Sequence, residues 1–180
     1  EIIDKGAGKG ALMYTTRELR DAASGELLCS LTSTSFLRGD GGFGGPTGPI
    51  RQPHPVPDGT PDATFDWTVG RHAALLYRLN GDYNPVHADP KAAAKGGFAQ
   101  PILHGLCSYG VAGWAVTSLL CDGDATRMRR FDLRFTAPVY PGETLRTEVW
   151  KQGPGVAAFR VRVPARDVIA LNNGRAEYLP

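Results

Sequence analysis

The sequence has few cysteines and no apolar run long enough to cross a membrane. Its three cysteines, Cys29, Cys107 and Cys121, are odd in number and form no CxxC pair, which argues against a disulfide framework or a zinc site. The most apolar stretch, 103–120, is interrupted by His104 and several glycines and falls short of the roughly 18 apolar residues that a membrane span needs. No signal peptide is recognisable. We therefore expect reduced thiols in a cytosol-like compartment.

Net charge is also small. The 180 residues carry 20 Lys and Arg against 18 Asp and Glu, a formal net charge of +2. This balance argues against a general nucleic-acid-binding protein, which needs a strong positive potential to attract phosphates. Apolar residues at 42% and charged residues at 21% are ordinary for a globular chain of one domain or one and a fraction.

Glycine and proline, by contrast, are abundant and clustered. Residues 39–61 contain 13 Gly or Pro among 23 positions, a composition that leaves little regular structure and predicts a linker or a long surface loop. Before it, the stretches 11–19 and 26–36 have strand composition and are joined by turn residues, so they predict a hairpin. Two strands alone are marginal in water, so this segment needs another surface to pack against.

Downstream of the linker, the pattern predicts three helices and four strands. Thr68 is a candidate N-cap for the first helix, and Gly81 stands where a glycine commonly follows a helix end. The third helix is apolar nearly all round, which is typical of a buried helix. The first helix is expected between Thr68 and Gly81, the other two at 90–95 and 104–120, and the strands at 130–136, 144–152, 156–163 and 168–179, with a bulge near 172–174.

One short loop carries the candidate acid–base residues. Asp82, Asn84 and His87 lie within six positions that also contain Pro85. A carboxylate and an imidazole in such proximity can activate a water molecule. The alternative for each residue taken singly is structural, because Gly-Asp-x-Asn-Pro is good turn chemistry and a histidine is often satisfied within a core.

A second candidate is Gly105, at the start of the long apolar helix. The first N–H groups of a helix have no intrahelical partner and favour negative charge, so this residue is a candidate oxyanion donor. The alternative is a glycine that only permits close packing. Cys107 with His104 could suggest a thiol nucleophile, but no third orienting group is apparent, and a small core thiol is the better interpretation.

At these residues the chain resembles the MaoC-like hydratases, specifically the (R)-specific 2-enoyl-CoA hydratase 2 type. The family pattern of Tyr, a short gap and Gly-Asp-x-Asn-Pro-apolar-His stands here at 77–87. Pro-Ile-Leu-His-Gly at 101–105 and the stretch 135–144 also match, and the resemblance covers essentially all of 62–180.

The resemblance implies an α+β hot dog fold, in which an antiparallel β-sheet wraps a long central helix. Tandem members of the family contain two hot dogs. This chain is expected to hold one complete hot dog, the catalytic domain at 62–180, after the linker at 39–61. Residues 1–38 resemble the last strands of a preceding, incomplete hot dog half.

The resemblance further implies a lyase of fatty-acid metabolism and β-oxidation, or of steroid side-chain metabolism. Such an enzyme adds water reversibly and syn to a trans-2-enoyl-CoA and gives an (R)-3-hydroxyacyl-CoA. Asp82 and His87 inherit the catalytic roles, Asn84 a supporting one, and the Gly105 N–H the binding of the thioester oxygen. The expected partner is the acyl-CoA substrate, with no metal, no cofactor beyond the substrate's CoA, no nucleic acid and no membrane. A cytoplasmic homodimer is expected, with a peroxisomal location as the alternative.

Two other functions stay open on the sequence. A hot dog acyl-CoA thioesterase usually has a carboxylate in the long helix, and 105–121 contains none. A non-catalytic acyl-CoA-binding module has no need for the Asp82, Asn84 and His87 that are intact here.

Overall fold

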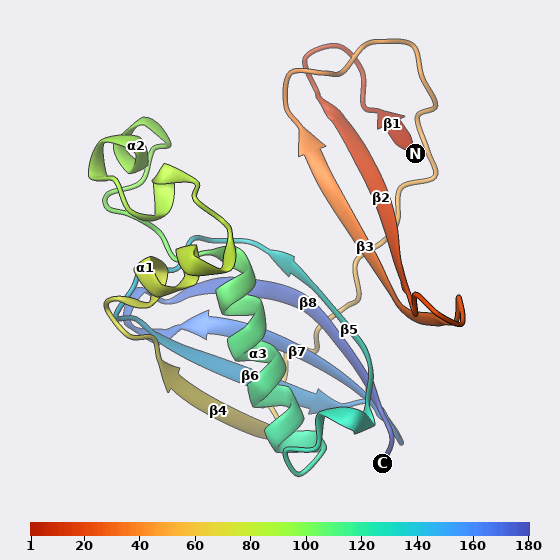
Figure 1. Ribbon diagram of the computed structural model, residues 1–180, viewed down its shortest axis with the longest axis vertical. Coiled ribbons are helices and arrows are strands. Elements are labelled where there is room, and N and C mark those ends of the chain that lie inside the picture. Colours follow the sequence, from red (N-terminus) through yellow and green to blue (C-terminus); the bar gives the residue numbers. More distant parts are fainter. The chain divides into compact units, whose positions relative to one another are not determined.

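The computed structural model describes all residues, 1–180. The chain divides into two compact units, Glu1–Gln52 and Pro53–Pro180, each built on its own antiparallel sheet (Figure 1). The boundary lies inside the Gly/Pro-rich segment, where no helix or strand forms between Leu37 and Ala63.

The first unit is a three-stranded antiparallel sheet. Strands β2 (Ala11–Arg20) and β3 (Leu27–Leu37) form the predicted hairpin, and β1 (Ile2–Asp4) pairs with the other edge of β2. Asp21 closes the turn, since its Oδ1 accepts the N–H groups of Ala23 and Ser24. The hairpin prediction is confirmed, whereas β1, which is only three residues long, was not predicted.

Asp4 ties part of the glycine-rich segment to this first unit. Its side chain is almost buried, at 4% exposure. Its carboxylate accepts N–H groups from Gly6, Gly42 and Gly44 at 2.7–2.8 Å. A Cβ on Gly42 would lie 2.9 Å from the Ala7 Cα, and Gly42 has a φ of +89°, so glycine is required there. These backbone donors, Gly42 first, hold the pKa of Asp4 below its ordinary value.

Acidification is expected to release this glycine-rich loop. Because the folded-state pKa of Asp4 is depressed, its hydrogen bonds stabilise the fold above the unfolded-state pKa, and this contribution is lost as the pH falls through the folded-state value. Amide hydrogen-exchange protection factors of Gly42 and Gly44 should fall over that window. In Asp4→Ala they should be low at every pH. Wild-type protection in that variant would contradict the anchoring role.

The second unit has a five-stranded antiparallel sheet with one long helix across one face (Figure 1). The helix α3 spans Gly105–Leu120, and it buries Ala112, Val116 and Leu120 against the sheet. This is the hot dog arrangement that the resemblance implies. The strand order is β4-β6-β7-β8-β5, with β4 at Ala63–Thr68, β5 at Met128–Phe135, β6 at Thr144–Lys151, β7 at Val156–Val163 and β8 at Val168–Tyr178.

The start of this unit differs from the prediction. Thr68 does not cap a helix: it ends β4, pairs with Thr144 and shares a side-chain hydrogen bond with it at 2.8 Å. The helix α1 covers only Ala73–Tyr77, and its N-cap residue His72 makes no side-chain cap bond. The prediction of Thr68 as an N-cap is therefore wrong, because cross-strand pairing uses the hydroxyl that a cap would need.

The bulge predicted in the last strand is confirmed. Along β5, Asp132 pairs with Arg175 of β8, but Arg134, two residues later, pairs with Asn172, three residues away from Arg175. Asn173, within this irregularity, has a left-handed φ of 56°. Gly174 lies directly against Phe159, whose side chain is fully buried. A Cβ on Gly174 would be 2.4 Å from the Phe159 carbonyl oxygen, so only glycine fits beside the largest core side chain.

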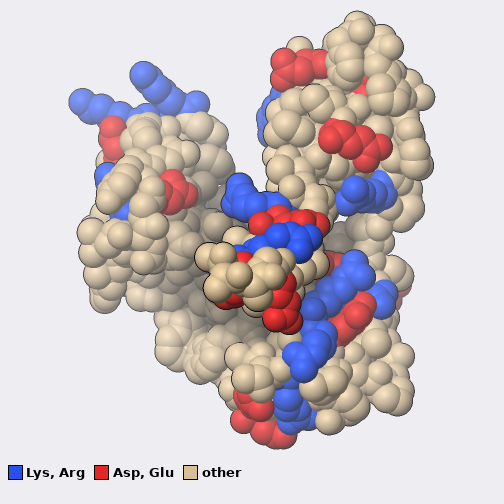
Figure 2. All heavy atoms as spheres, turned by 45° about the vertical axis from the view of Figure 1, so that its right-hand side comes forward, with Lys and Arg blue, Asp and Glu red and all other residues tan.

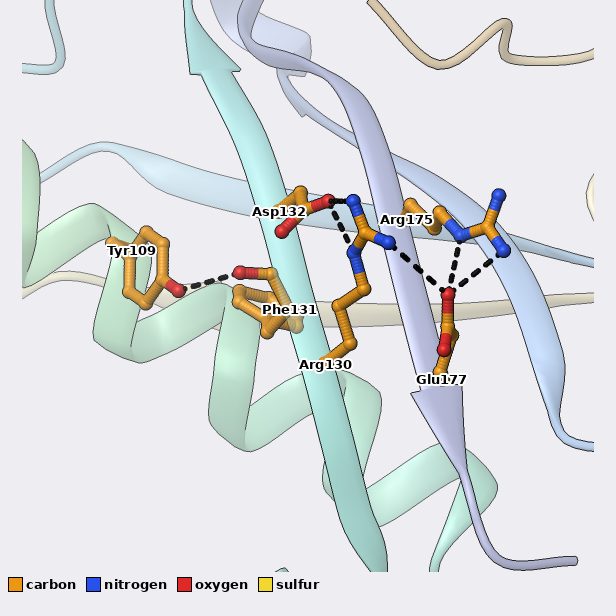
Figure 3. Close-up of polar contacts among 6 residues, drawn as sticks. All are labelled: Tyr109, Arg130, Phe131, Asp132, Arg175 and Glu177. Atoms are coloured by element: carbon orange, nitrogen blue, oxygen red, sulfur yellow. Dashed lines mark hydrogen bonds and ion pairs between the residues drawn. The ribbon is translucent and has the colours of Figure 1, made fainter. Parts of the chain in front are cut away.

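The outer face of this sheet carries paired charges. Arg130 bonds Asp132 on the same strand and also contacts Glu177, which bonds Arg175, while the Tyr109 hydroxyl of α3 donates to the Phe131 carbonyl of β5 (Figure 3). Lysine and arginine side chains alternate with acidic ones on the surface (Figure 2). Exposed pairs of this kind contribute about 0–1 kcal/mol each. None of the helices has the length and apolarity that a membrane span demands.

Candidate active site

The candidate acid–base residues lie on a loop between α1 and the short helix α2 (Pro90–Lys95). A 3₁₀ turn, η1 (Arg78–Asn80), ends at Gly81, which has the left-handed φ of 103° predicted for this position. A second 3₁₀ turn, η2 (Pro85–His87), then brings His87 inward. The loop is thus bounded on both sides by tight turns.

Asn84 shapes this loop from within. Its Oδ1 accepts the N–H of Val86 at 3.2 Å and caps η2, with Pro85 at the first position. Its own N–H donates to Asp82 Oδ1 at 3.2 Å. The structure therefore gives Asn84 a local supporting contact to the Asp82 carboxylate, which is otherwise exposed.

His87 is held with one ring nitrogen occupied and the other free. Its side chain is 8% exposed, and Nδ1 lies 2.8 Å from the Ile102 carbonyl oxygen. Because a carbonyl can only accept, Nδ1 carries the hydrogen, and in the neutral ring Nε2 carries the lone pair. This tautomer leaves Nε2 of His87 available as a base.

His104 joins the site, although it was not among the predicted site residues. Its side chain is 1% exposed and stacks on the His87 ring, with centroids 3.7 Å apart and planes at 22°. Its Nε2 lies 3.2 Å from the main-chain carbonyl oxygen of Asp82, and the Tyr77 ring lies 4.6 Å away. Burial lowers the pKa of His104. The one available signal was a histidine inside an otherwise apolar stretch.

Gly105 is the first residue of α3, as predicted. Its N–H donates to no acceptor within the protein, so it is free to bind an external oxygen. A Cβ here would lie 3.1 Å from the ring of Phe135. The packing alternative therefore also holds in part: the glycine both exposes an N–H group and accommodates the Phe135 ring.

One polar side-chain atom from each of Asp82, His87 and His104 lies within 4.8 Å of those of the other two. A carboxylate and an imidazole at this separation can share one water molecule. The three side chains are close enough together to hold a metal ion, but each imidazole has only one ring nitrogen to offer it. The other nitrogen of each ring already faces a main-chain carbonyl.

A cavity of about 600 Å³ opens beside His87. Its wall also includes Arg71, Gln100 and Tyr140. Of the predicted site residues, His87 alone lines it.

Cys107 is half-buried near the site, and burial raises the pKa of its thiol, which disfavours the thiolate that a nucleophile needs.

Comparison with known proteins identifies the same region. The family described as MaoC like domain matches residues 53–173. The 3-hydroxyacyl-thioester dehydratase Y of Mycobacterium tuberculosis is 44% identical over 184 residues, covering 99% of this chain and 63% of that protein. The probable enoyl-CoA hydratase 2 of Dictyostelium discoideum is 41% identical over 177 residues, covering 97% and 60%.

A solved structure is similar over the same extent. The MaoC-like dehydratase from Phytophthora capsici superposes with a TM-score of 0.90 at 38% identity, covering 98% of this chain and 61% of that one. The chain thus spans about 60% of the length of these relatives. With a family match across the hot dog unit and the Gly81–His87 loop folded as described, the chain belongs to the MaoC-like dehydratase family.

Proposed function

We propose that this chain carries the catalytic hot dog of an (R)-specific 2-enoyl-CoA hydratase, which adds water reversibly to a trans-2-enoyl-CoA. The observation that carries the proposal is the cluster of Asp82 and His87, with one polar atom of each within 4.8 Å of the other, together with the unpaired N–H of Gly105. The names of the two relatives, a 3-hydroxyacyl-thioester dehydratase and an enoyl-CoA hydratase 2, support the same chemistry.

The reaction needs a water molecule held between the Asp82 carboxylate and His87 Nε2. One of these groups takes a proton from the water, whose oxygen then forms a bond to C3 of the enoyl group. The C2–C3 double bond electrons move toward the thioester, and the Gly105 N–H stabilises the resulting enolate oxygen. A proton returned to C2 from the same face completes a syn addition. Acid–base help of this kind is worth about 10²–10⁴-fold.

The residues supply this chemistry without a metal or a redox cofactor, and we propose that none takes part. Addition of water changes no oxidation state overall. Asn84 serves the reaction indirectly, since its N–H bonds the Asp82 carboxylate and its side chain caps η2.

A thioesterase would use the same substrate class but cleave the thioester. The proposal disfavours it because α3 holds no carboxylate between Gly105 and Leu120. Ultraviolet absorbance with crotonyl-CoA or trans-2-decenoyl-CoA separates the two activities. A hydratase bleaches the enoyl-thioester band without releasing thiol, and the product should be the (R)-3-hydroxyacyl-CoA. Thiol release titrated with a disulfide reagent would overturn the proposal, as would binding without turnover.

We also propose that the chain associates with a second copy. In the first unit, the hairpin exposes apolar side chains on both strands: Leu19, Leu27, Leu28, Leu31 and Phe36 are all 45–65% exposed. In the second unit, Trp67 and Trp114 are stacked edge to face and are also nearly half exposed. Apolar surface of this kind favours association.

The proposed compartment is reducing, since all three cysteines are free.

A further inference from the structure

We infer that His104 is a positioning residue of this site: its neutral imidazole fixes the ring plane of His87 and the main chain of Asp82 against the start of α3. The inference rests on the proposed hydratase function for its consequence in turnover. Its structural content stands on the contacts of His104 alone.

The position of His104 is unusual for a residue that precedes a helix. It occupies the N-cap of α3 but makes no side-chain cap bond. Its carbonyl accepts the N–H of Cys107 at 3.0 Å and of Ser108 at 3.3 Å, while its ring turns inward and is buried. An imidazole is costly to bury, and here it is not used to cap the helix that it begins.

Each contact of this ring reaches a different part of the site. The ring of His104 stacks on that of His87, 17 positions earlier in the sequence. Its Nε2 contacts the main-chain carbonyl oxygen of Asp82. The backbone of His104 leads directly into Gly105. One side chain thus connects the base, the carboxylate loop and the proposed oxyanion donor. Since misplacement by about 1 Å can lower turnover about 10²-fold, such a connection matters to the reaction.

The hydrogen bonds also define the state of the ring. A main-chain carbonyl only accepts, so Nε2 of His104 carries the hydrogen and Nδ1 carries the lone pair. This Nδ1 is buried with no partner. Protonation would place a second N–H at Nδ1 without an acceptor, with His87 and Arg78 nearby disfavouring the added charge. Asp82 has the opposite effect, but burial dominates, and the neutral ring is the one that stacks on His87.

Because Nδ1 of His104 is buried without a partner, the effect of a substitution on turnover can be distinguished from its effect on stability. An apolar ring of similar size at position 104 removes an unsatisfied buried nitrogen, which offsets the loss of the Nε2 contact. The Asp82 main chain lies in an exposed stretch, so water can replace that contact. His104→Phe should therefore stay folded with a melting temperature within a few degrees of wild type, whereas a purely structural role predicts that activity and stability fall together.

The test compares His104→Phe, which keeps a ring, with His104→Gln, which keeps an N–H donor for the Asp82 carbonyl. His54→Phe is the matched control, since His54 bonds Gln152 after β6. In folded variants at position 104, kcat for hydration should fall at least about tenfold while KM stays within about threefold. The control should retain both constants. Unchanged kcat in both variants would overturn the inference.

A second readout does not depend on turnover. The chain has four histidines, so nitrogen-15 histidine labelling with single substitutions assigns each ring by NMR. At pH 7, His104 should be the neutral Nε2–H tautomer, the hydrogen of the neutral His87 ring should lie on Nδ1, and the His87 signals should change in both variants. A protonated His104, or His87 signals identical to wild type, would refute the positioning role. An inactive wild type with the expected tautomers would instead refute the hydratase proposal and leave this inference standing.

Discussion

Replacing Asp82 with Asn is expected to lower kcat for hydration by about 10²–10⁴-fold. The amide can still accept the Asn84 N–H that bonds Asp82 Oδ1 at 3.2 Å, so the loop should keep its shape, but it cannot take a proton from water. His87→Asn should have an effect of the same order, because its side-chain NH₂ can replace Nδ1–H toward the Ile102 carbonyl while removing Nε2.

Asp89→Asn is the matched control for this pair. Asp89 is the N-cap of α2, its Oδ1 accepts the Lys91 N–H at 2.8 Å, and Asn is an equally good cap. Steady-state rates with crotonyl-CoA, alongside circular dichroism, should show an active control and two folded but inactive site variants. Near-normal turnover in folded Asp82→Asn or His87→Asn would remove the residue concerned from the mechanism.

Gly105→Pro is expected to lower kcat by about 10²–10³-fold, the usual cost of losing one oxyanion donor. Proline is well tolerated at the first position of a helix, and His104 already has the extended ψ of 133° that a residue before proline requires. Because the Gly105 N–H bonds no protein acceptor, the substitution removes a donor for substrate and no bond of the fold.

Gly105→Ala separates the lost donor from the added bulk. Both variants place a Cβ about 3.1 Å from the Phe135 ring, and that ring is half exposed and free to move by a few tenths of an ångström. The alanine variant keeps its N–H and should retain most of its turnover. Equal losses in the two variants would assign the effect to crowding against Phe135 and end the oxyanion role for Gly105.

Local structure in this protein was readable from the sequence. Gly81 takes the left-handed conformation expected at its position, Asn84 and Pro85 form a turn, and α3 lies within one residue of its predicted bounds. Each of these features depends on hydrogen bonds or steric limits within a few residues. The short sequence 81–87 therefore carries both the shape of the loop and the two residues, Asp82 and His87, that we propose as the acid–base pair.

The pairing of strands was harder to predict from the sequence. The segment 63–68 forms the edge strand β4 because it pairs with β6, about 80 residues later. Thr68 suits a helix cap and a strand end equally well by composition, and the hydroxyl of Thr144 opposite it decides between them. In the first unit, Gly42 and Gly44 looked like linker residues until the carboxylate of Asp4 bound their N–H groups.

The sequence by itself thus determined the family, the long helix and the loop that carries the proposed acid–base residues. Only the tertiary structure decided that His104 stacks on His87 and that Phe135 lies against Gly105. The spacing of apolar residues and the presence of turn-forming residues predict hydrogen bonds between backbone groups that are a few residues apart in the sequence. The contacts of His104 and Phe135 depend instead on which faces the sheet and α3 bury together, and no pattern along the chain encodes that choice.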